Sequence, residues 1–480
     1  MDNRPLWKHQ ADAVRLADTH KDVALLMDMG VGKSRTAIEI LRRKYAKVGR
    51  LRKTLILAPK IVCPNWKNEF KMYSKVLQKD IVVLLGTGKK RVKEFLTAVG
   101  EDLQGNKIIV TNYESMQMED LFALLRAWGV EILVCDESQR LKNHQSKRAR
   151  AVVTIADHTQ HNFILTGSPI LNSAMDIFMQ FRVLDRGETF GKNFFGFRAK
   201  YFHDANAQWA GKQSYFPKWE ERQDTYDVLQ GMIKKKAIRV LKKDCLDLPP
   251  FVRQRIEVGL SPEQAKAYRE MYHDYVTFLE DNKGQPRAVV AEMAVVKALR
   301  LQQIVSGFVN DENGNPIRFK QVPRLDALAE LLEDVVVDGK KKVIIWAVFR
   351  ENYKMISEVC DKLGIKYTHI TGDTKDKEGS MKAFREDPDI GVCIANQGAG
   401  GVGINLVEAG YSIYYSKGFK LEDDLQSEAR NYRGGSEIHE SITRIDIVTP
   451  HTIDELTNDA LANKLQVSEH ILGWKEQMKL

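Results

Sequence analysis

Continuous runs of apolar residues recur along the chain, and they constrain its fold more than any other feature. Six runs fall in the first half: DVALLM, KTLILAP, DIVVLL, NKIIVTNY, EILVCDES and NFILTGS. The same rhythm of strand-like segments returns in the second half, in KKVIIWAVF, KYTHITG, IGVCIAN, YSIYYS and TRIDIVTP. A strand with one solvent-facing side alternates apolar and polar residues, whereas an unbroken run is typical of a strand buried on both faces. The runs therefore predict parallel sheets whose strands are connected by helices.

The two groups of runs predict an α/β protein with two parallel-sheet lobes and a mostly helical insertion between them. A chain of 480 residues exceeds one ordinary hydrophobic core. Residues 184–303 are charged and helix-like, and Pro249 and Pro250 in CLDLPPF interrupt regular structure. We expect a first lobe over residues 1–248, with a helical insertion at about 185–245, and a second lobe over residues 249–480, with a helical segment at about 260–320.

Composition argues against a membrane-spanning or secreted protein and favours one with a polyanionic partner. The apolar runs are much shorter than the roughly eighteen residues of a membrane span. The N-terminal MDNRPLWKHQADAV has no basic stretch followed by an apolar one, which argues against a secretory signal. The five cysteines form no C-x-x-C pair, as expected of free thiols in a reducing compartment. The net charge of +9 suits a polyanionic partner. We therefore expect a cytoplasmic protein.

The stretch LLMDMGVGKSRTAIEIL places glycines between a buried strand and a helical pattern. Gly30 and Gly32 fall at the turn, where backbone N–H groups and the positive end of the helix can hold phosphates. Lys33 would reach the β- and γ-phosphates of a nucleotide, and the Ser34 hydroxyl would bind Mg²⁺. The alternative is an ordinary glycine turn with a surface lysine, because Met27 stands where the strict G-x-x-x-x-G-K-[ST] motif begins with glycine.

A second candidate site lies in EILVCDESQRLKN, where a predicted strand ends in Asp136 and Glu137. Both carboxylates would lie at the carboxyl edge of the parallel sheet, where the glycine-bearing turn also opens. In phosphoryl transfer one acid holds Mg²⁺ and another orients or deprotonates the attacking water. Alone, an Asp-Glu pair after a strand is also compatible with a solvated turn. Together with the upstream glycine turn, it indicates a site of nucleotide hydrolysis.

The order of these segments resembles that of the Swi/Snf-type DNA translocases, which are helicase-like ATPases of superfamily two. Their first motif, D-E-M-G-L-G-K-T, also lacks a glycine at the position of Met27, so the irregular loop is a family trait. The matching segments, in chain order and over nearly the whole sequence, are PLWKHQADAV, LILAPKIVCPNWKNEF, VTNYESM, CDESQRLKN, LTGSPILN, IRVLKKDCLDLPP, GAGGVGINLVEAG and QSEARNYRGGS. Several positions depart from the family's usual residues. In the first motif, Met27 and Asp28 stand in place of Asp and Glu, and Ser34 in place of Thr. Elsewhere the departures are Ser138 and Gln139, in place of Ala and His, Val240 and Leu241, in place of part of a basic run, and Ala429 and Tyr432, in place of Asp and His.

The resemblance implies two RecA-like lobes and roles for individual residues. Gln10 would contact the base, and Gly403 would lie at the nucleotide. Lys33 and Glu137 would be catalytic, together with Arg430 and Arg433, which would reach the γ-phosphate from the second lobe when the lobes close. An arginine in that position is worth roughly 10³ to 10⁵ in rate. Metal binding would fall to Ser34 and Asp136, so the implied cofactors are ATP and Mg²⁺.

The resemblance also implies nucleic-acid contacts that do not read sequence. They would come from Pro59, Thr111, Thr371, Gly372, Gly400 and Gly401, the last two within the glycine run 398–403. The aromatic and basic stretch FGKNFFGFRAKYFHDANAQWAGKQSYFPKW could stack on bases, but we interpret most of it as a small helical core. The basic stretch MIKKKAIRVLKK is equally compatible with a solvated helix face and with a backbone contact.

We therefore expect an ATPase that is stimulated by double-stranded DNA and that moves along it, as a monomer and without a membrane partner. A helicase that anneals or unwinds forks or junctions shares every motif and is the first alternative. A DNA-binding module that no longer hydrolyses ATP is the second. The chain uses nearly its full length for these motifs, which suggests a compact bacterial or viral member of the family.

Overall fold

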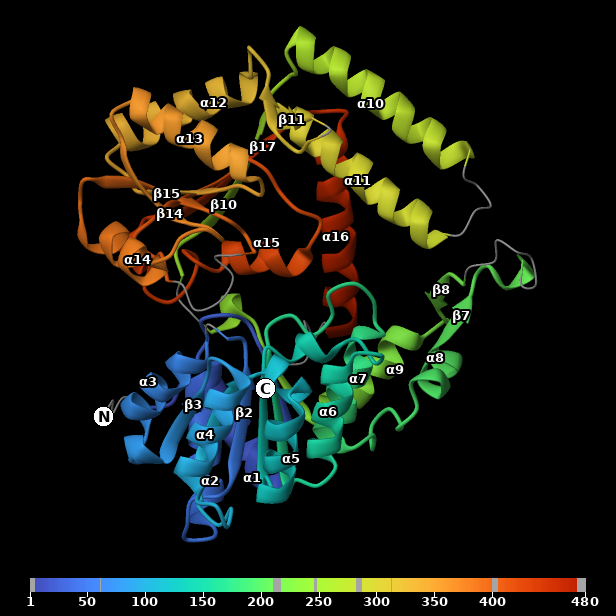
Figure 1. Ribbon diagram of the computed structural model, residues 1–480, viewed down its shortest axis with the longest axis vertical. Helices are drawn as coiled ribbons and strands as arrows, with labels where there is room; N and C mark the ends of the chain where they lie inside the picture. Colours follow the sequence, from blue (N-terminus) through green and yellow to red (C-terminus); the bar gives the residue numbers. More distant parts are fainter. Residues whose placement is uncertain are drawn as a thin grey trace. The chain divides into compact units, whose positions relative to one another are not determined.

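The computed structural model describes residues 5–60, 62–209, 217–245, 248–281, 287–311, 313–398 and 405–472. The chain forms two compact units. One contains residues 1–203, 219–246 and 464–480, and the other contains residues 204–218 and 247–463. Each unit is built around one parallel sheet with its own hydrophobic cores (Figure 1). The prediction of an α/β fold with two parallel-sheet units is confirmed.

The first unit contains a seven-stranded sheet with the order β3-β4-β2-β5-β6-β1-β9. Its strands are β1 (Val23–Met27), β2 (Thr54–Ala58), β3 (Ile81–Leu84), β4 (Ile108–Asn112), β5 (Ile132–Asp136), β6 (His161–Thr166) and β9 (Ala237–Val240). All neighbouring strands pair in parallel. The six apolar runs of the first half form β1 to β6, as predicted.

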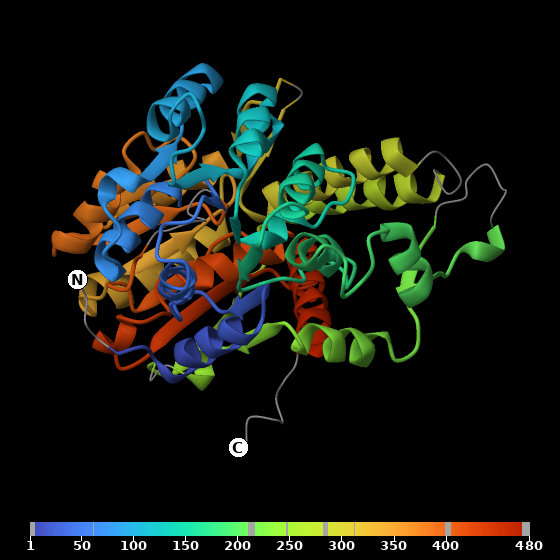
Figure 2. The ribbon, with the colours of Figure 1, turned by 90° about the horizontal axis from the view of Figure 1, so that it is seen from below.

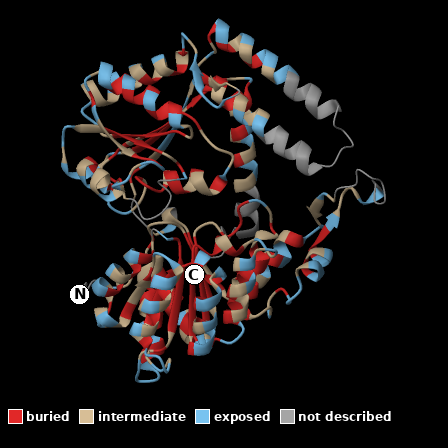
Figure 3. Ribbon diagram, in the orientation of Figure 1, coloured by how far each residue is buried: buried red, intermediate tan, exposed pale blue. Residues whose placement is uncertain are grey.

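The helices of the first unit cover both faces of this sheet. They are α1 (Lys8–Thr19), α2 (Lys33–Ala46), α3 (Cys63–Tyr73), α4 (Gly88–Val99), α5 (Glu119–Trp128), α6 (Lys147–Ala156), α7 (Asp176–Asp185), α8 (Phe194–Tyr201) and α9 (Thr225–Lys234). Successive side chains of a strand point to opposite faces. Accordingly, Ala24 and Leu26 belong to one core cluster, whereas Val23, Leu25 and Met27 belong to the other. Both faces are thus sealed, and Figure 3 shows the strands as buried.

The segment predicted as a helical insertion differs in part from that prediction. It contains α8 and α9, but also the short paired strands β7 (Phe202–Asp204) and β8 (Trp219–Glu221), and β9 joins the main sheet beside β1. The sequence gives little sign of β9 because this edge strand is only four residues long and has basic neighbours such as Lys235 and Lys236.

The second unit contains a six-stranded parallel sheet with the order β10-β17-β16-β13-β15-β14. Its strands are β10 (Phe251–Glu257), β13 (Val343–Trp346), β14 (Lys366–Ile370), β15 (Ile390–Ala395), β16 (Tyr411–Tyr414) and β17 (Ile442–Val448). The five apolar runs of the second half form β13 to β17, as predicted. The edge strand β10 was not predicted, because most of its side chains are exposed and it lacks an apolar run.

The helices of the second unit begin with α10 (Pro262–Asp281) and α11 (Arg287–Val305), which lie side by side in Figures 1 and 2. The short strands β11 (Phe308–Asn310) and β12 (Pro316–Arg318) form an antiparallel pair after them. The later helices are α12 (Pro323–Leu332), which continues as a π-helical turn over Glu333–Asp338, α13 (Arg350–Lys362), α14 (Lys377–Glu386), α15 (Leu421–Glu428) and α16 (Ile453–Leu472). Among the described residues, no helix combines the length and apolar character that a membrane crossing requires.

Candidate nucleotide-binding and catalytic site

The loop between β1 and α2 has the backbone of a phosphate-binding turn. Gly30 and Gly32 both adopt the left-handed conformation, with φ of 84° and 85°, which side chains other than hydrogen disfavour. Gly32 is also the N-cap of α2, and a Cβ atom built there would collide with Nε2 of Gln10. The loop therefore needs glycine at this position, and it leads into the positive end of a helix.

Lys33 and Ser34 open α2 directly after this loop. The ammonium group of Lys33 donates to the backbone carbonyls of Met27 at 2.9 Å and Asp28 at 3.1 Å, so it lies over the loop rather than in solvent. Ser34 is half-buried in the first turn of α2. Together they place one cation and one hydroxyl where the predicted phosphates and metal would bind.

Helix α1 supports the loop from the other side. Gln10 is 1% exposed, and its Nε2 donates to the carbonyl of Gly32 at 3.4 Å. Its Oε1 accepts from the backbone N–H of Trp7 at 3.0 Å, and His9 forms a 2.9 Å bond with the carbonyl of Val31. Gln10 therefore lies against the phosphate loop, and its contact with a nucleotide base stays a prediction.

Asp136 is the last residue of β5 and Glu137 follows it, at the same edge of the sheet as the loop, because β5, β6 and β1 are parallel neighbours. Both are buried. Asp136 accepts hydrogen bonds from Trp66 Nε1 and from the backbone N–H of Glu137, each at 3.0 Å. Burial raises the pKa of Asp136, the neighbouring Glu137 raises it further, and the ammonium of Lys33 lowers it. Lys33 and Asp136 thus lie close enough to interact electrostatically.

Glu137 is held in an unusual conformation by a chain of hydrogen bonds. Its φ of 50° lies in the left-handed region, which is uncommon for a residue other than glycine and typical of functional sites. Its Oε2 accepts from Gln139 Nε2 at 2.8 Å, and Gln139 Oε1 accepts from the Thr166 hydroxyl at 2.6 Å. Thr166 in turn accepts from the backbone N–H of Ser168 at 3.0 Å. This series of hydrogen bonds connects Glu137 to the loop after β6.

The sequence did not indicate this connection. Gln139 stands out in the sequence only because the family commonly has histidine there, and it is separated from Thr166 by 27 positions. The neighbouring Ser138 donates to Gln180 of α7 at 2.8 Å, and Gln180 donates to the carbonyl of Pro169 at 2.6 Å. The segment after β5 is thus connected to the LTGSPILN loop at two points.

The predicted nucleic-acid residues of the first unit are buried. Thr111 is fully buried, and its hydroxyl donates to the carbonyl of Leu84 at 2.9 Å and lies 2.6 Å from Ser115 Oγ. The hydroxyl of Thr111 is therefore used inside the fold, and a contact of this position with nucleic acid stays a prediction. Pro59 follows β2, is buried, and accepts from the N–H of Val62 with its carbonyl at 2.8 Å.

The predicted residues of the second unit follow its strands and α15. Thr371 is buried at the end of β14 and bonded to Thr374, whereas Gly372 is exposed, with open space around it. Arg430 is 4% exposed and Arg433 is half-buried, both in the turn after α15. Gly400, Gly401 and Gly403, which the resemblance also implicates, lie outside the described residues.

The donor set at the loop suits Mg²⁺ bound together with a nucleotide. A serine hydroxyl and a buried carboxylate are hard oxygen donors, and Mg²⁺ usually takes one or two of these plus phosphate oxygens and water. In the described part of the chain, no group of three or more His, Cys, Asp or Glu side chains could hold a metal by itself. Ser34 and Asp136 therefore fit a shared metal rather than an all-protein site.

Comparison with known proteins identifies the family. Residues 9–306 match the SNF2-related domain, and residues 324–435 match the helicase conserved C-terminal domain. Protein CHROMATIN REMODELING 4 of Arabidopsis thaliana is 26% identical over an alignment 461 residues long, gaps included, which covers 90% of this chain and 19% of that protein. ATP-dependent helicase FUN30 of Saccharomyces cerevisiae is 24% identical over an alignment 511 residues long, gaps included, which covers 92% of this chain and 44% of that protein. The chain thus spans less than half the length of these curated relatives.

A solved structure, the Sulfolobus solfataricus SWI2/SNF2 ATPase core in complex with dsDNA, is also similar. It is 21% identical, its TM-score is 0.43, and the match covers 98% of this chain and 93% of that one. The SNF2-related match covers more than half of the chain and includes the phosphate loop, Asp136 and Glu137. The chain therefore belongs to the SNF2-related family, with a helicase C-terminal domain in its second unit.

Proposed function

We propose that this chain is a DNA-dependent ATPase that uses ATP and Mg²⁺ to move along double-stranded DNA. The observation that carries the proposal is the convergence of Lys33, Asp136 and Glu137 at one edge of a parallel sheet, beside a loop that accepts only glycine at position 32. Family membership supports it, and so do the names of the relatives, which include an ATP-dependent helicase and a chromatin remodelling protein.

In this proposal each site residue of the first unit has a separate role in hydrolysis. Lys33 binds the β- and γ-phosphates, and Ser34 and Asp136 would hold the metal. Bound Mg²⁺ supplies positive charge against the phosphate oxygens. Glu137 orients the attacking water and accepts its proton, while the bond from Gln139 to Oε2 fixes the carboxylate. Because a misaligned base lowers the rate of hydrolysis, holding the carboxylate in one orientation favours turnover.

The second unit would supply the remaining charge. Arg430 and Arg433 would stabilise negative charge on the transferring phosphoryl group in a closed state of the protein. The net charge of +9 favours a polyanion, and contacts with backbone phosphates would hold duplex DNA without reading its sequence. Cycles of closing and opening would then advance the protein along the duplex.

Phosphate release from ATP, measured with several nucleic acids, tests the proposal. We expect little release without nucleic acid, strong stimulation by unrelated duplexes, and weaker stimulation by single-stranded DNA and RNA. Lys33→Ala and Glu137→Gln should both abolish the stimulated rate. Equal rates with and without DNA would contradict the proposal. A rate that is maximal only with forks or junctions would instead support the alternative of a branched-DNA remodeller.

A further inference from the structure

Arg444, in β17, is a buried cation surrounded by three carboxylates. Its side chain is 3% exposed. Its guanidinium bonds to Asp424 at 2.9 and 3.2 Å, to Glu428 at 2.9 Å, and to Asp446 at 3.2 Å. The same group lies 3.9 Å from the centre of the Tyr414 ring. All three nitrogens of the Arg444 guanidinium therefore donate hydrogen bonds to these carboxylates.

Two of these carboxylates lie on α15, one helical turn apart. Asp424 is in the first half of the helix, and Glu428 is its last residue, two positions before Arg430. Glu428 also pairs with Arg253 of β10 at 2.6 Å. Because Asp424 and Glu428 are both bonded to one rigid side chain of the sheet, the carboxyl end of α15 cannot slide or rotate without breaking these bonds.

Other bonds continue this attachment beyond the end of the helix. Ser427 lies 3.0 Å from the hydroxyl of Tyr414. Asn431 donates to the carbonyl of Ala409 at 3.0 Å and accepts from Ser412 at 3.1 Å. The segment that contains Arg430 is thus fastened to the sheet on both sides, with Arg444 on the helical side.

Stability alone gives little reason for such a cluster. Removing charges from water costs about as much as their attraction returns, so a buried ion pair is often no more stabilising than apolar residues. Its directional bonds do, however, select one geometry, because the planar guanidinium presents its donors in a fixed fork. A cluster of this kind is therefore better explained by the placement of the segment that it holds.

We propose that Arg444 is a positioning residue, which fixes the end of α15 and so sets where Arg430 and Arg433 lie during hydrolysis. The inference rests on the proposed ATPase function. A misplacement of about 1 Å can lower a rate by about 10²-fold. Arg444→Lys keeps the charge but has all its donors on one nitrogen, so it cannot reproduce the bonds that Nε, Nη1 and Nη2 make to the three carboxylates, and it should release the helix end.

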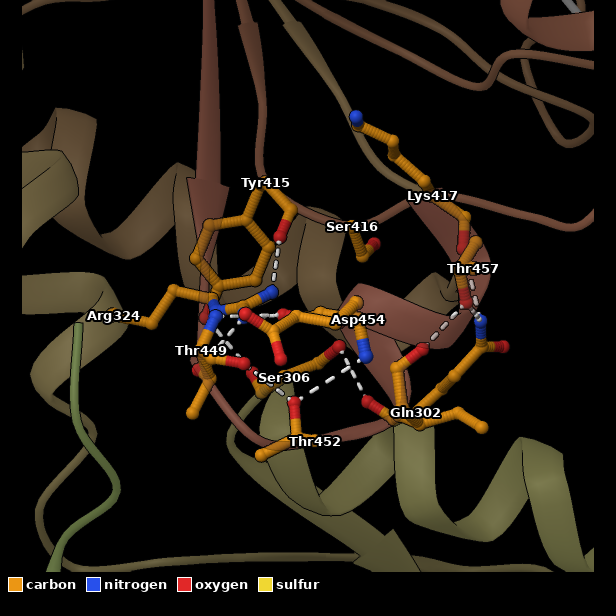
Figure 4. A network of polar contacts seen from close by, with 12 residues as sticks. Gln302, Ser306, Arg324, Tyr415, Ser416, Lys417, Thr449, Thr452, Asp454 and Thr457 are labelled. Atoms are coloured by element: carbon orange, nitrogen blue, oxygen red, sulfur yellow. Dashed lines mark hydrogen bonds and ion pairs between the residues drawn. The ribbon is translucent and has the colours of Figure 1, made fainter. Parts of the chain in front are cut away.

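The same unit offers a matched control in Arg324, shown in Figure 4. Arg324 of α12 is also buried, and it donates to the carbonyl of Tyr415 at 2.8 Å and to the Thr449 hydroxyl at 2.9 Å, besides pairing with Asp454. These partners lie at the ends of β16 and β17 and in α16, not in α15. Arg324→Lys therefore perturbs a comparable buried cation without touching the segment before Arg430.

The test compares DNA-stimulated turnover, nucleotide affinity and melting temperature for Arg444→Lys, Arg324→Lys and wild type. We expect Arg444→Lys to lower kcat by about 10- to 100-fold, with nucleotide affinity within about twofold of wild type, since the phosphate loop is in the other unit. Arg324→Lys should lower the melting temperature similarly but keep most of kcat. Equal losses of kcat in both variants would overturn the inference.

A double-variant comparison separates positioning from general damage. If Arg444 acts through the arginines, Arg444→Lys should add little to the loss already caused by Arg433→Ala, because interactions that act as a unit are not additive. Fully additive losses would contradict the inference. A wild-type protein that does not hydrolyse ATP at all would instead refute the proposed function on which it rests.

A second variant covers the case in which Arg444→Lys fails to fold. Glu428→Gln weakens the same attachment at the helix end, and Glu351→Gln is its control, since Glu351 pairs with Arg318 and Lys354 away from α15. Glu428→Gln should lower kcat several-fold more than Glu351→Gln does. Equal turnover in the two variants would contradict the positioning role.

Discussion

Replacing Gln139 with leucine tests whether the hydrogen-bond chain from Thr166 to Glu137 matters for both stability and turnover. Gln139 is 2% exposed, so the substitution acts inside the fold. It removes the 2.8 Å bond to the Glu137 carboxylate, and a hydrogen bond to a charged group contributes about 1.5–3 kcal/mol. It also leaves the Thr166 hydroxyl without its acceptor, at a cost of about 1–3 kcal/mol. Burial of the leucine side chain offsets part of this, so we expect a loss of about 2–4 kcal/mol.

The effect on turnover should exceed what destabilisation explains. Without the bond from Gln139, the Glu137 carboxylate can rotate, so we expect kcat to fall by about 10- to 100-fold while nucleotide affinity stays within a few-fold of wild type. Gln180→Leu is the matched control, because Gln180 is a buried glutamine that bonds to Ser138 and not to Glu137. It should destabilise the protein comparably and lower kcat much less.

Urea unfolding and DNA-stimulated phosphate release measure the two effects. Thr166→Val in the Gln139→Leu background should cost less than the sum of the single changes, since replacing both partners of a buried bond leaves no stranded hydroxyl. If Gln139→Leu kept both its unfolding free energy and its turnover near the wild-type values, the chain of hydrogen bonds would have no functional role.

The remaining predictions concern the nucleotide site. Lys33→Ala should abolish turnover and weaken ATP binding in a filter or fluorescence titration, whereas Glu137→Gln should stop turnover and keep ATP bound. Gly32→Ala should reduce ATP affinity and thermal stability, because its φ of 85° and the collision with its neighbour both oppose a Cβ atom. The folded protein holds the proton of Asp136 more tightly than the unfolded chain does. Stability without nucleotide should therefore fall as pH rises from the ordinary Asp range towards the raised pKa, and Asp136→Asn should flatten that dependence in thermal melts. Arg433→Ala should lower turnover by about 10³-fold with ATP affinity little changed, and Arg433→Lys should rescue little.

The sequence was sufficient to predict the strands and turns that depend on short, local patterns of residues. Each of the eleven segments became a strand. Most are apolar because a strand buried on both faces needs apolar residues at every position, whereas the more polar KYTHITG forms the partly exposed β14. The positions of Gly30 and Gly32 in the turn could also be predicted, since left-handed backbone favours glycine. The edge strands β9 and β10 were missed because an edge strand carries exposed and charged side chains and so lacks the pattern of a buried one.

Contacts between distant segments could not be predicted in this way. Gln139 and Thr166 meet only because β5 and β6 are neighbours in the sheet, and no local pattern specifies that pairing of side chains. Thr111 was predicted only as a nucleic-acid contact, and the sequence did not indicate that it is buried near the end of β4, where its hydroxyl donates to the carbonyl of Leu84. A family motif therefore indicated which segments matter, while the orientation of each side chain depended on the tertiary structure.

Displacement of a third strand from a DNA triplex tests the central claim most directly. A protein that moves along duplex DNA removes a bound third strand in its path, without any need to separate the duplex itself. We predict displacement that requires ATP and Mg²⁺, does not depend on duplex sequence, and is abolished by Glu137→Gln. Rapid ATP hydrolysis on duplex DNA without displacement of the third strand would show that the chain does not translocate and would contradict the account.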